Sequence, residues 1–434
     1  MYTKKVFNNI AYLVGENSLK LFAGLFLSVM IARHLGAENY GNFSYVISFV
    51  SLFTPFYILG LEDITIKELV NDNKKHNKLL GTTITLQFFG AIAGIFIMNI
   101  VSLILTPDAY LIRSSIFVLS TATLMRCFQT IEYHFLAIVE IKKVSLTRNF
   151  IILIISAIKF LFLILKKDWN FFVYISCFEI FLMGIGYLFV YKISKMSIRD
   201  WVVDKKYVRG LLLKGAPLFL AAFFVMAMSK VDQIMISNFL GNAELGRYSI
   251  TVKLIDLWNF LPLILISSLY PDLISSESSQ DFNIKTINLF GSVIYLAIMF
   301  AVGVIIVSAP IVNFLYGESY KDSAKYLSLY ALLTIPIYFT MAQSKFLLIK
   351  GAQKDFLYLM AFAVSLNIIL NLLLIPRIGV EGAILASAIT YIGSNVFFSL
   401  INTNVRDSNE YFLTSLFLFP LVLVKSIWKR KDPK

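Results

Sequence analysis

The sequence predicts an all-α membrane protein with twelve transmembrane helices in two parallel six-helix lobes around a central cavity. Three observations predict this fold. Of the 434 residues, 58% are hydrophobic and only 15% charged, which is more apolar surface than a soluble chain of this size buries. Apolar segments long enough to cross a bilayer, about 20 residues, recur from end to end. One ten-residue pattern also occurs twice, 205 residues apart.

The repeated pattern marks corresponding positions in two halves of the chain. Leu35-Gly36-x4-Gly41-x-Phe43-Ser44 reappears as Leu240-Gly241-x4-Gly246-x-Tyr248-Ser249. Each copy follows one long apolar segment and opens another, as expected of an internally repeated membrane bundle. Glycine accepts a positive φ and allows close backbone approach. We therefore expect a tight helix-to-helix turn at both copies.

The apolar segments define the predicted spans. They cover residues 8–32, 40–61, 79–105, 112–139, 146–165, 170–193, 212–237, 246–274, 286–309, 324–348, 355–375 and 380–402. Because each half has an even number of spans, both halves enter the membrane with the same orientation. The predicted domains are an N-terminal lobe (1–200), a C-terminal lobe (201–403) and a cytoplasmic tail (404–434).

Basic residues fix the predicted orientation. With a cytoplasmic N-terminus, the inner loops and N-terminus carry 20 lysines and arginines and the outer loops carry 8, as the positive-inside rule requires. Topology thus explains most of the net charge of +13, and no nucleic-acid partner is expected. The apolar segment 411–427 is short, contains Pro420 and precedes Lys429-Arg430-Lys431. We expect it to be a short interfacial or re-entrant segment with a cytoplasmic C-terminus.

Few residues suggest bond-making chemistry. Cys127 and Cys177 lie in apolar segments, and the three histidines lack the spacing of metal ligands. The sequence therefore predicts no catalytic residue, no metal site and no bound cofactor. Coupling to protons or sodium ions is left open.

Ionisable side chains inside the spans are the candidate functional residues. Each costs roughly 2.5 to 3.5 kcal/mol at the centre of a helix unless it pairs or faces water. They are Glu16, Lys20, Arg126, Glu132, Lys159, Glu179, Lys230, Asp232, Lys253, Asp256 and Lys345. Six cations and five acids make the interior balanced or slightly positive. This suits an anionic head group better than a lipophilic cation.

The spacing of these charges indicates which of them share a helix face. Glu16 and Lys20 are four residues apart, and Lys253 and Asp256 are three apart. Ser249 and Phe260 flank Lys253 and Asp256 on the same face of the eighth span. Subtracting the offset of 205 maps these four positions onto a stripe on the second span, which consists of Ser44, Ser48, Ser51 and Pro55. Both faces are expected to line one shared cavity. The alternative is that each charged pair is neutralised within its helix and only stabilises packing.

Other charges are expected to need partners on neighbouring helices. Lys230 and Asp232 are two residues apart and cannot share a narrow helix face. Arg126 forms a polar stripe with Thr130 and Tyr133, and could instead pair with Glu132. Carboxylates that lie beside a movable ammonium can exchange a proton or cation. This makes Glu16, Asp232 and Asp256 candidates for ion coupling.

Several motifs resemble one family. Ala32-Arg33-x-Leu35-Gly36-Ala37-Glu38-x-Tyr40-Gly41 resembles the signature after the first helix of the Wzx-type polysaccharide flippases, in the multidrug/oligosaccharidyl-lipid/polysaccharide exporter superfamily. Leu59-Gly60-Leu61 with Lys67-Glu68 resembles the end of its second helix. Val231-Asp232-Gln233 with the second glycine motif resembles its seventh helix and following turn. Pro376-Arg377-Ile378-Gly379-Val380-x-Gly382-Ala383 resembles the entry to its twelfth helix.

This resemblance implies a function. It implies a flippase that carries undecaprenyl-diphosphate-linked oligosaccharide across the bacterial inner (cytoplasmic) membrane, with a polysaccharide polymerase and chain-length proteins as further partners. Cationic residues of the cavity would hold the diphosphate and anionic sugars, and Lys20, Lys230, Lys253 and Arg126 match that kind of position. O-antigen, capsule and other envelope glycans all stay open as the product.

Two other functions compete with this one. The first is a cation-coupled multidrug or toxin antiporter of the same superfamily, which would need sites dominated by carboxylates. Here a cation lies close in sequence to each of Glu16, Asp232 and Asp256. The second is a membrane polymerase or ligase, an enzyme that would need a sizeable outer loop, whereas the longest here spans about residues 309–323. A flippase that is not an enzyme is the preferred interpretation.

Overall fold

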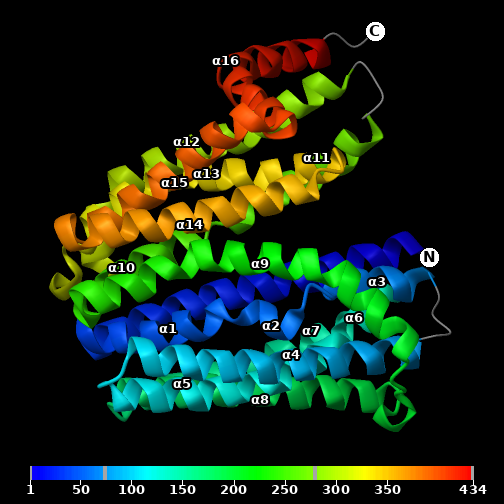
Figure 1. Cartoon of the computed structure of the whole chain (residues 1–434), viewed down its shortest axis with the longest axis vertical. Helices are drawn as coiled ribbons and strands as arrows, with labels where there is room; N and C mark the ends of the chain where they lie inside the picture. Colours follow the sequence, from blue (N-terminus) through cyan, green and yellow to red (C-terminus); the bar gives the residue numbers. More distant parts are fainter. Residues whose placement is uncertain (1, 72–75, 277–280, 432–434) are drawn as a thin grey trace. The chain divides into compact units, whose positions relative to one another are not determined.

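The computed structural model describes the backbone of residues 2–71, 76–276 and 281–431, and the side chains of these ranges between 23 and 420. The described residues are almost entirely helical and include no strand (Figure 1). The helices are α1 (Tyr2–Leu52), α2 (Thr54–Ile58), α3 (Glu62–Asn71), α4 (His76–Leu105), α5 (Tyr110–Ala122), η2 (Thr123–Gln129), α6 (Thr130–Ala137), α7 (Lys142–Ile164), α8 (Trp169–Ile193), η3 (Ile198–Asp200), α9 (Lys205–Leu240), α10 (Asn242–Asp256), α11 (Phe260–Ser275), α12 (Phe282–Tyr316), η4 (Glu318–Tyr320), α13 (Ser323–Ile349), α14 (Gln353–Ile378), α15 (Val380–Ile401) and α16 (Thr403–Lys431).

The predicted membrane helices are present. Ten segments, from His76–Leu105 to Val380–Ile401, are long and apolar enough to cross a bilayer, and each overlaps one of the ten predicted spans after the second. An eleventh is the bent pair Ala23–Leu52 and Thr54–Asn71, which corresponds to the predicted second span and part of the first. Much of the predicted first span lies outside the described side chains. The predicted fold class is confirmed.

Both glycine turns have the expected backbone. Gly36 breaks α1 with φ 69° and ψ 172°, and Gly241 separates α9 from α10 with φ 89° and ψ 170°. An L-residue with a side chain is strained in this conformation. The two copies therefore share a local structure as well as a sequence, and the prediction of a tight turn at each is confirmed.

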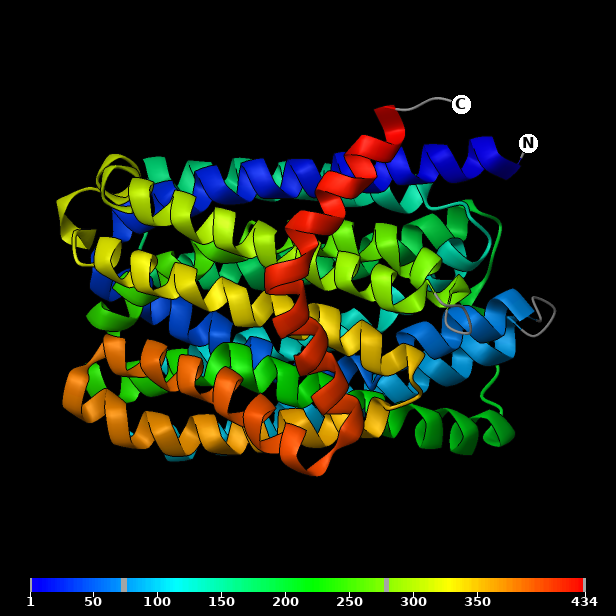
Figure 2. The same cartoon turned by 90° about the horizontal axis from the view of Figure 1, so that it is seen from above.

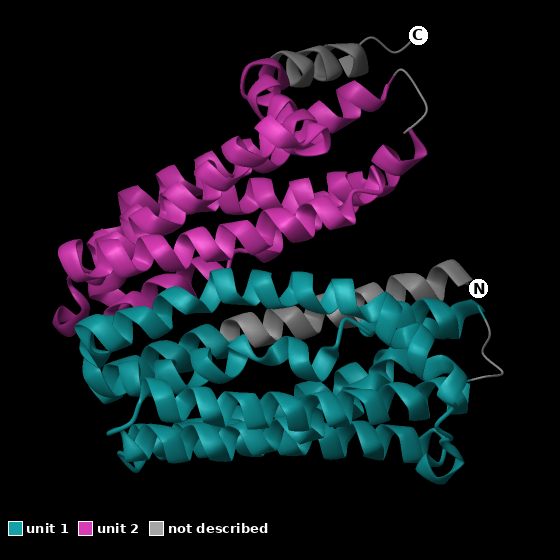
Figure 3. Cartoon of the chain, viewed as in Figure 1, with its two compact units in different colours: residues 1–246 teal, residues 247–434 magenta. Residues whose placement is uncertain are grey.

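The chain divides into two compact units, residues 1–246 and 247–434 (Figure 3). Helix α9 belongs to unit 1, where it packs against α1, α2 and α4. The predicted lobes were defined by the repeat and not by contacts, and their boundaries at residues 200 and 403 stay a prediction.

Helix α16 includes the predicted apolar segment 411–427. It packs within unit 2 against α12, α13 and α15. Figure 2 shows it in red, running obliquely over the other helices of this unit. The Tyr295 hydroxyl donates to the Leu416 carbonyl at 2.8 Å, and the Phe419 ring lies directly against Gly291. Residues up to 420 are thus held by tertiary packing.

Candidate functional site

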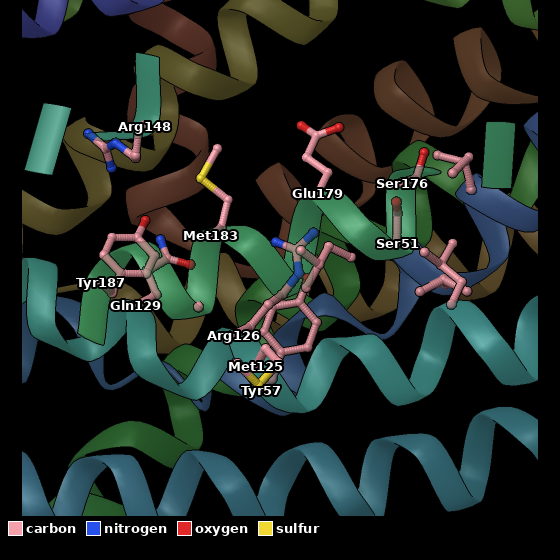
Figure 4. Close-up of a pocket in the computed structure, with 15 residues that line it drawn as sticks. Ser51, Tyr57, Met125, Arg126, Gln129, Arg148, Ser176, Glu179, Met183 and Tyr187 are labelled. Carbon is pink, nitrogen blue, oxygen red and sulfur yellow. The ribbon is translucent and has the colours of Figure 1, made fainter. Parts of the chain in front are cut away.

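A polar cavity of about 370 Å³ lies within unit 1 (Figure 4). Helices α1, α2, α5, η2, α7 and α8 contribute to its walls. Its polar lining consists of Ser51, Tyr57, Arg126, Gln129, Arg148, Ser176, Glu179 and Tyr187. Two arginines and a glutamate in one hollow among apolar helices make it the leading candidate site in the described part of the chain.

Arg126 reaches this cavity from a break in a membrane span. The span Tyr110–Ala137 changes from α-helix to a 3₁₀ segment at Thr123 and back to α-helix at Thr130. Such a break inside a helix often marks a functional hinge. Gly184 on α8 permits the close approach of this segment, because an added Cβ would lie 2.8 Å from the methyl carbon of Met125.

The Arg126 guanidinium makes unusually few contacts. Its Cζ atom lies 5.0 Å from the centroid of the Tyr57 ring, and its Nε is buried without a hydrogen-bond partner. It forms no hydrogen bond or ion pair with the described residues. A cation–π contact offsets part of the cost of burial, but the buried Nε donor without a partner remains expensive. Arg126 is therefore equipped to bind an anion.

Glu132 is held by other groups. Arg148 of α7 donates to Oε1 of Glu132 in an ion pair, and the Tyr187 hydroxyl donates to Oε2 at 3.0 Å. Glu132 is only 7% exposed. The pairing of Arg126 with Glu132 that the sequence left open is therefore not what the structure shows.

Glu179 also has a cationic partner. Its Oε2 lies 2.8 Å from Nζ of Lys159, which comes from α7. Figure 4 shows Arg126 next to Tyr57, with Arg148 and Tyr187 to one side of it and Ser51 and Ser176 to the other. The cavity and its ion-pair partners thus hold three cations and two carboxylates, and Arg126 is the cation without an acid among the described residues.

The remaining predicted site residues lie elsewhere. Lys230 is half-buried and Asp232 is 5% exposed on α9 in unit 1, and neither lines this cavity. Lys253 and Asp256 are exposed on α10 in unit 2, where Asp256 accepts a hydrogen bond from the Asn259 amide at 3.0 Å. Of the predicted substrate-binding and ion-coupling residues whose side chains the structure describes, only Arg126 lines the cavity. Glu16 and Lys20 lie outside the described side chains.

The predicted serine stripe has mixed roles. Ser51 lines the cavity, whereas the buried Ser48 donates to the side-chain oxygen of Gln233 on α9. Ser44 is also buried, at 7% exposure. Part of the stripe therefore serves helix packing, and the cavity shared with α10 stays a prediction.

The two glycine motifs contact each other within unit 1. A Cβ on Gly41 would lie 1.7 Å from the carbonyl oxygen of Asn242, and a Cβ on Gly246 would lie 1.9 Å from that of Ala37. The Asn242 side-chain amide donates to Oδ1 of Asn42 at 2.6 Å. The second glycine of each motif thus allows the close approach expected from the sequence, while the first supplies the positive φ.

A match between this sequence and a family profile identifies the family. The profile of the polysaccharide biosynthesis protein family matches residues 6–277, more than half of the chain. The chain belongs to that family. The resemblance inferred from the motifs is confirmed. No curated protein sequence matches significantly.

Solved structures show the same fold. "Lipid II flippase MurJ, inward closed conformation" has a TM-score of 0.64 at 18% identity, over 99% of this chain and 94% of that one. An inward-facing multidrug resistance MATE family transporter of the MOP superfamily has a TM-score of 0.63 at 10% identity, over 90% of this chain and 96% of that one. A MOP superfamily transporter from Pyrococcus furiosus, described by a reverse polarity of its binding pocket, has a TM-score of 0.57 at 12% identity, over 91% of this chain and 96% of that one. At these identities the likeness shows the fold alone. These solved neighbours are described as a flippase and as transporters.

Proposed function

We propose that this protein is an inner-membrane flippase that translocates undecaprenyl-diphosphate-linked oligosaccharide for surface polysaccharide biosynthesis. The observation that carries the proposal is the cavity of unit 1, where Arg126 has no acidic partner among the described residues. Both nearby carboxylates, Glu132 and Glu179, are already paired with cations. An antiporter of cationic drugs needs the opposite balance. The polysaccharide biosynthesis family and the likeness in fold to the lipid II flippase MurJ support the same class of substrate.

The roles predicted from the sequence complete the proposal. Lys20, Lys230, Lys253 and Arg126 bind the anionic substrate. The candidates for coupling to a proton or sodium gradient are Glu16, Asp232 and Asp256. The N-terminus is cytoplasmic, so the glycine turns lie at the outer surface.

Alternating access is the proposed mechanism. Moving an unpaired polar head group through hydrocarbon costs several kcal/mol per group, so the saccharide needs a protein path while the lipid tail stays in the bilayer. We propose that the contact of Gly41 with Asn242 and of Gly246 with Ala37 closes the outer end of this path. These turns separate when substrate leaves and meet again afterwards.

The test uses purified protein in proteoliposomes with a fluorescent undecaprenyl-diphosphate trisaccharide. Asn42→Cys and Asn242→Cys are combined after Cys127 and Cys177 are replaced by serine, because the two asparagine side chains already touch. A short, reducible thiol cross-linker is expected to stop flipping, and reduction should restore it. Each single cysteine variant is the matched control.

Three outcomes separate the parts of the proposal. Unchanged flipping in the cross-linked protein would show that this contact is not a gate. No flipping by the uncross-linked protein, together with gradient-driven export of a cationic dye, would replace the flippase with the multidrug antiporter. Absence of both activities in folded protein would overturn both functions.

A further inference from the structure

We propose that unit 2 carries a binding site for phosphatidylethanolamine, a lipid whose head group joins a primary ammonium to a phosphate. The site is a cavity of about 430 Å³ formed by α12, the end of α13 and α16. Its polar lining consists of Asn283, Lys350, Asp407, Glu410, Tyr411 and Thr414. None of these residues has a part in the proposed transport path, so the site is independent of the proposed function.

The part of the cavity that α16 contributes is acidic. Asp407, Glu410 and Thr414 are spaced three and four residues apart, so they lie on one face of this helix. The half-buried Asp407 carboxylate makes no hydrogen bond or ion pair with the described residues. Glu410 has only a long contact, 3.9 Å from its Oε1 to Nε of Arg406, and both side chains are exposed. Because such exposed pairs are weak, both carboxylates are available to a cationic group.

One cation lines the same cavity. Lys350 directly follows α13, and its Nζ lies 4.6 Å from the centroid of the Phe282 ring and 5.9 Å from that of Phe346. It forms no hydrogen bond or ion pair with any residue that the structure describes. The two cation–π contacts hold the ammonium beside the cavity, while its three N–H donors stay unused. Lys350 is therefore available to an anionic group.

A ligand that carries both charges suits this lining best. A metal ion or a simple amine would meet the Lys350 ammonium, and a free phosphate would meet Asp407 and Glu410. A zwitterion avoids both repulsions. Its ammonium donates charge-assisted hydrogen bonds to the carboxylates, and its phosphate accepts them from Lys350. The Thr414 hydroxyl has no partner in the described ranges and can also donate to the phosphate.

The surroundings of the cavity favour a lipid over a soluble zwitterion. The cavity lies where α12 begins and α13 ends, which is the end of two membrane spans and hence the level of lipid head groups. On α16, Leu413 is 56% exposed and Phe417 is 76% exposed. Each lies three residues beyond a lining residue, Glu410 or Thr414. A helix with exposed apolar side chains next to its polar ones can contact acyl chains at the bilayer surface.

The test is native mass spectrometry of the purified full chain in detergent, with equal amounts of dioleoyl phosphatidylethanolamine, phosphatidylcholine and phosphatidylglycerol. Phosphatidylcholine has a methylated ammonium without N–H donors, and phosphatidylglycerol has no ammonium. We expect the first bound lipid to be phosphatidylethanolamine, preferred by about 10-fold, because a hydrogen bond between charged groups has at least that value. Asp407→Asn should remove the preference over phosphatidylglycerol. Lys350→Met should weaken the binding of all three lipids.

Asp281→Asn and Lys354→Met are the matched controls. Each removes the same charge from an exposed residue near the same helix ends that does not line the cavity, and both should bind as the wild-type protein does. Equal binding of the three lipids to the wild-type protein, or an unchanged preference in Asp407→Asn, would overturn the site. Displacement of the lipid by equimolar glycerophosphoethanolamine, the free head group, would overturn the choice of a lipid. Thermal unfolding shows whether each variant is folded, and Glu410→Gln repeats the test if Asp407→Asn is not.

Discussion

Replacement of Gly41 by alanine tests the proposed gate with a single methyl group. The new Cβ would lie 1.7 Å from the carbonyl oxygen of Asn242, which is 1.3 Å short of the 3.0 Å below which real Cβ atoms essentially never occur. Both atoms belong to backbone or are fixed to it, so no side chain can rotate away. Overpacking of this kind costs about 1–3 kcal/mol. If the turns separate during transport, this cost falls only on the closed state and shifts the equilibrium toward the open one by roughly 5-fold to 150-fold.

The shift is measured as thiol labelling of Asn42→Cys by a membrane-impermeant reagent, in protein that lacks Cys127 and Cys177. The Asn42 side chain contacts Asn242 in the closed arrangement, so its labelling rate should rise with the open population. Gly24→Ala is the control, because an added Cβ there meets nothing within 4 Å. A lower melting temperature with an unchanged labelling rate in Gly41→Ala would refute the gate, since the cost would then fall on the whole fold.

Two further predictions concern topology and stability. Asn39→Cys, exposed beside the first glycine turn, should label from outside intact cells and Asp200→Cys should not; the reverse pattern would invert the proposed orientation. Arg148→Met should destabilise the protein by about 3–5 kcal/mol because it leaves the buried Glu132 without its cation, whereas Arg148→Met combined with Glu132→Met should recover most of the melting temperature. No recovery in the double variant would indicate that Arg148 stabilises the helices mainly through other contacts.

Much of the fold could be predicted because membrane helices are encoded locally. A long apolar segment must form its hydrogen bonds within itself, so hydropathy found the ten spans that the structure describes in full. The glycine turns were also predictable, since a positive φ and a close approach both demand the absence of a side chain. These are properties of short stretches of sequence.

The cavity could be predicted only in part because contacts between helices decide which of its charges form ion pairs. Arg126 was identified as a charge inside a span. Arg148 lies within the predicted span 146–165 but near its inner end, so it was counted among the basic residues that set the orientation and not as a site residue. Periodicity along one helix could not reveal its partner Glu132, which lies on another helix, or the 3₁₀ break that presents Arg126.

The glycine contact is equivalent in the two copies of the motif. Under the offset of 205 residues, Gly41 corresponds to Gly246 and Ala37 to Asn242. Gly41 meets Asn242 while Gly246 meets Ala37, so the contact is unchanged when the two copies are exchanged. The two halves of the contact are therefore equivalent, and a motion that separates the two turns is expected to open both. Gly246→Ala should therefore shift the labelling of Asn42→Cys in the same direction as Gly41→Ala, although the two glycines are 205 residues apart.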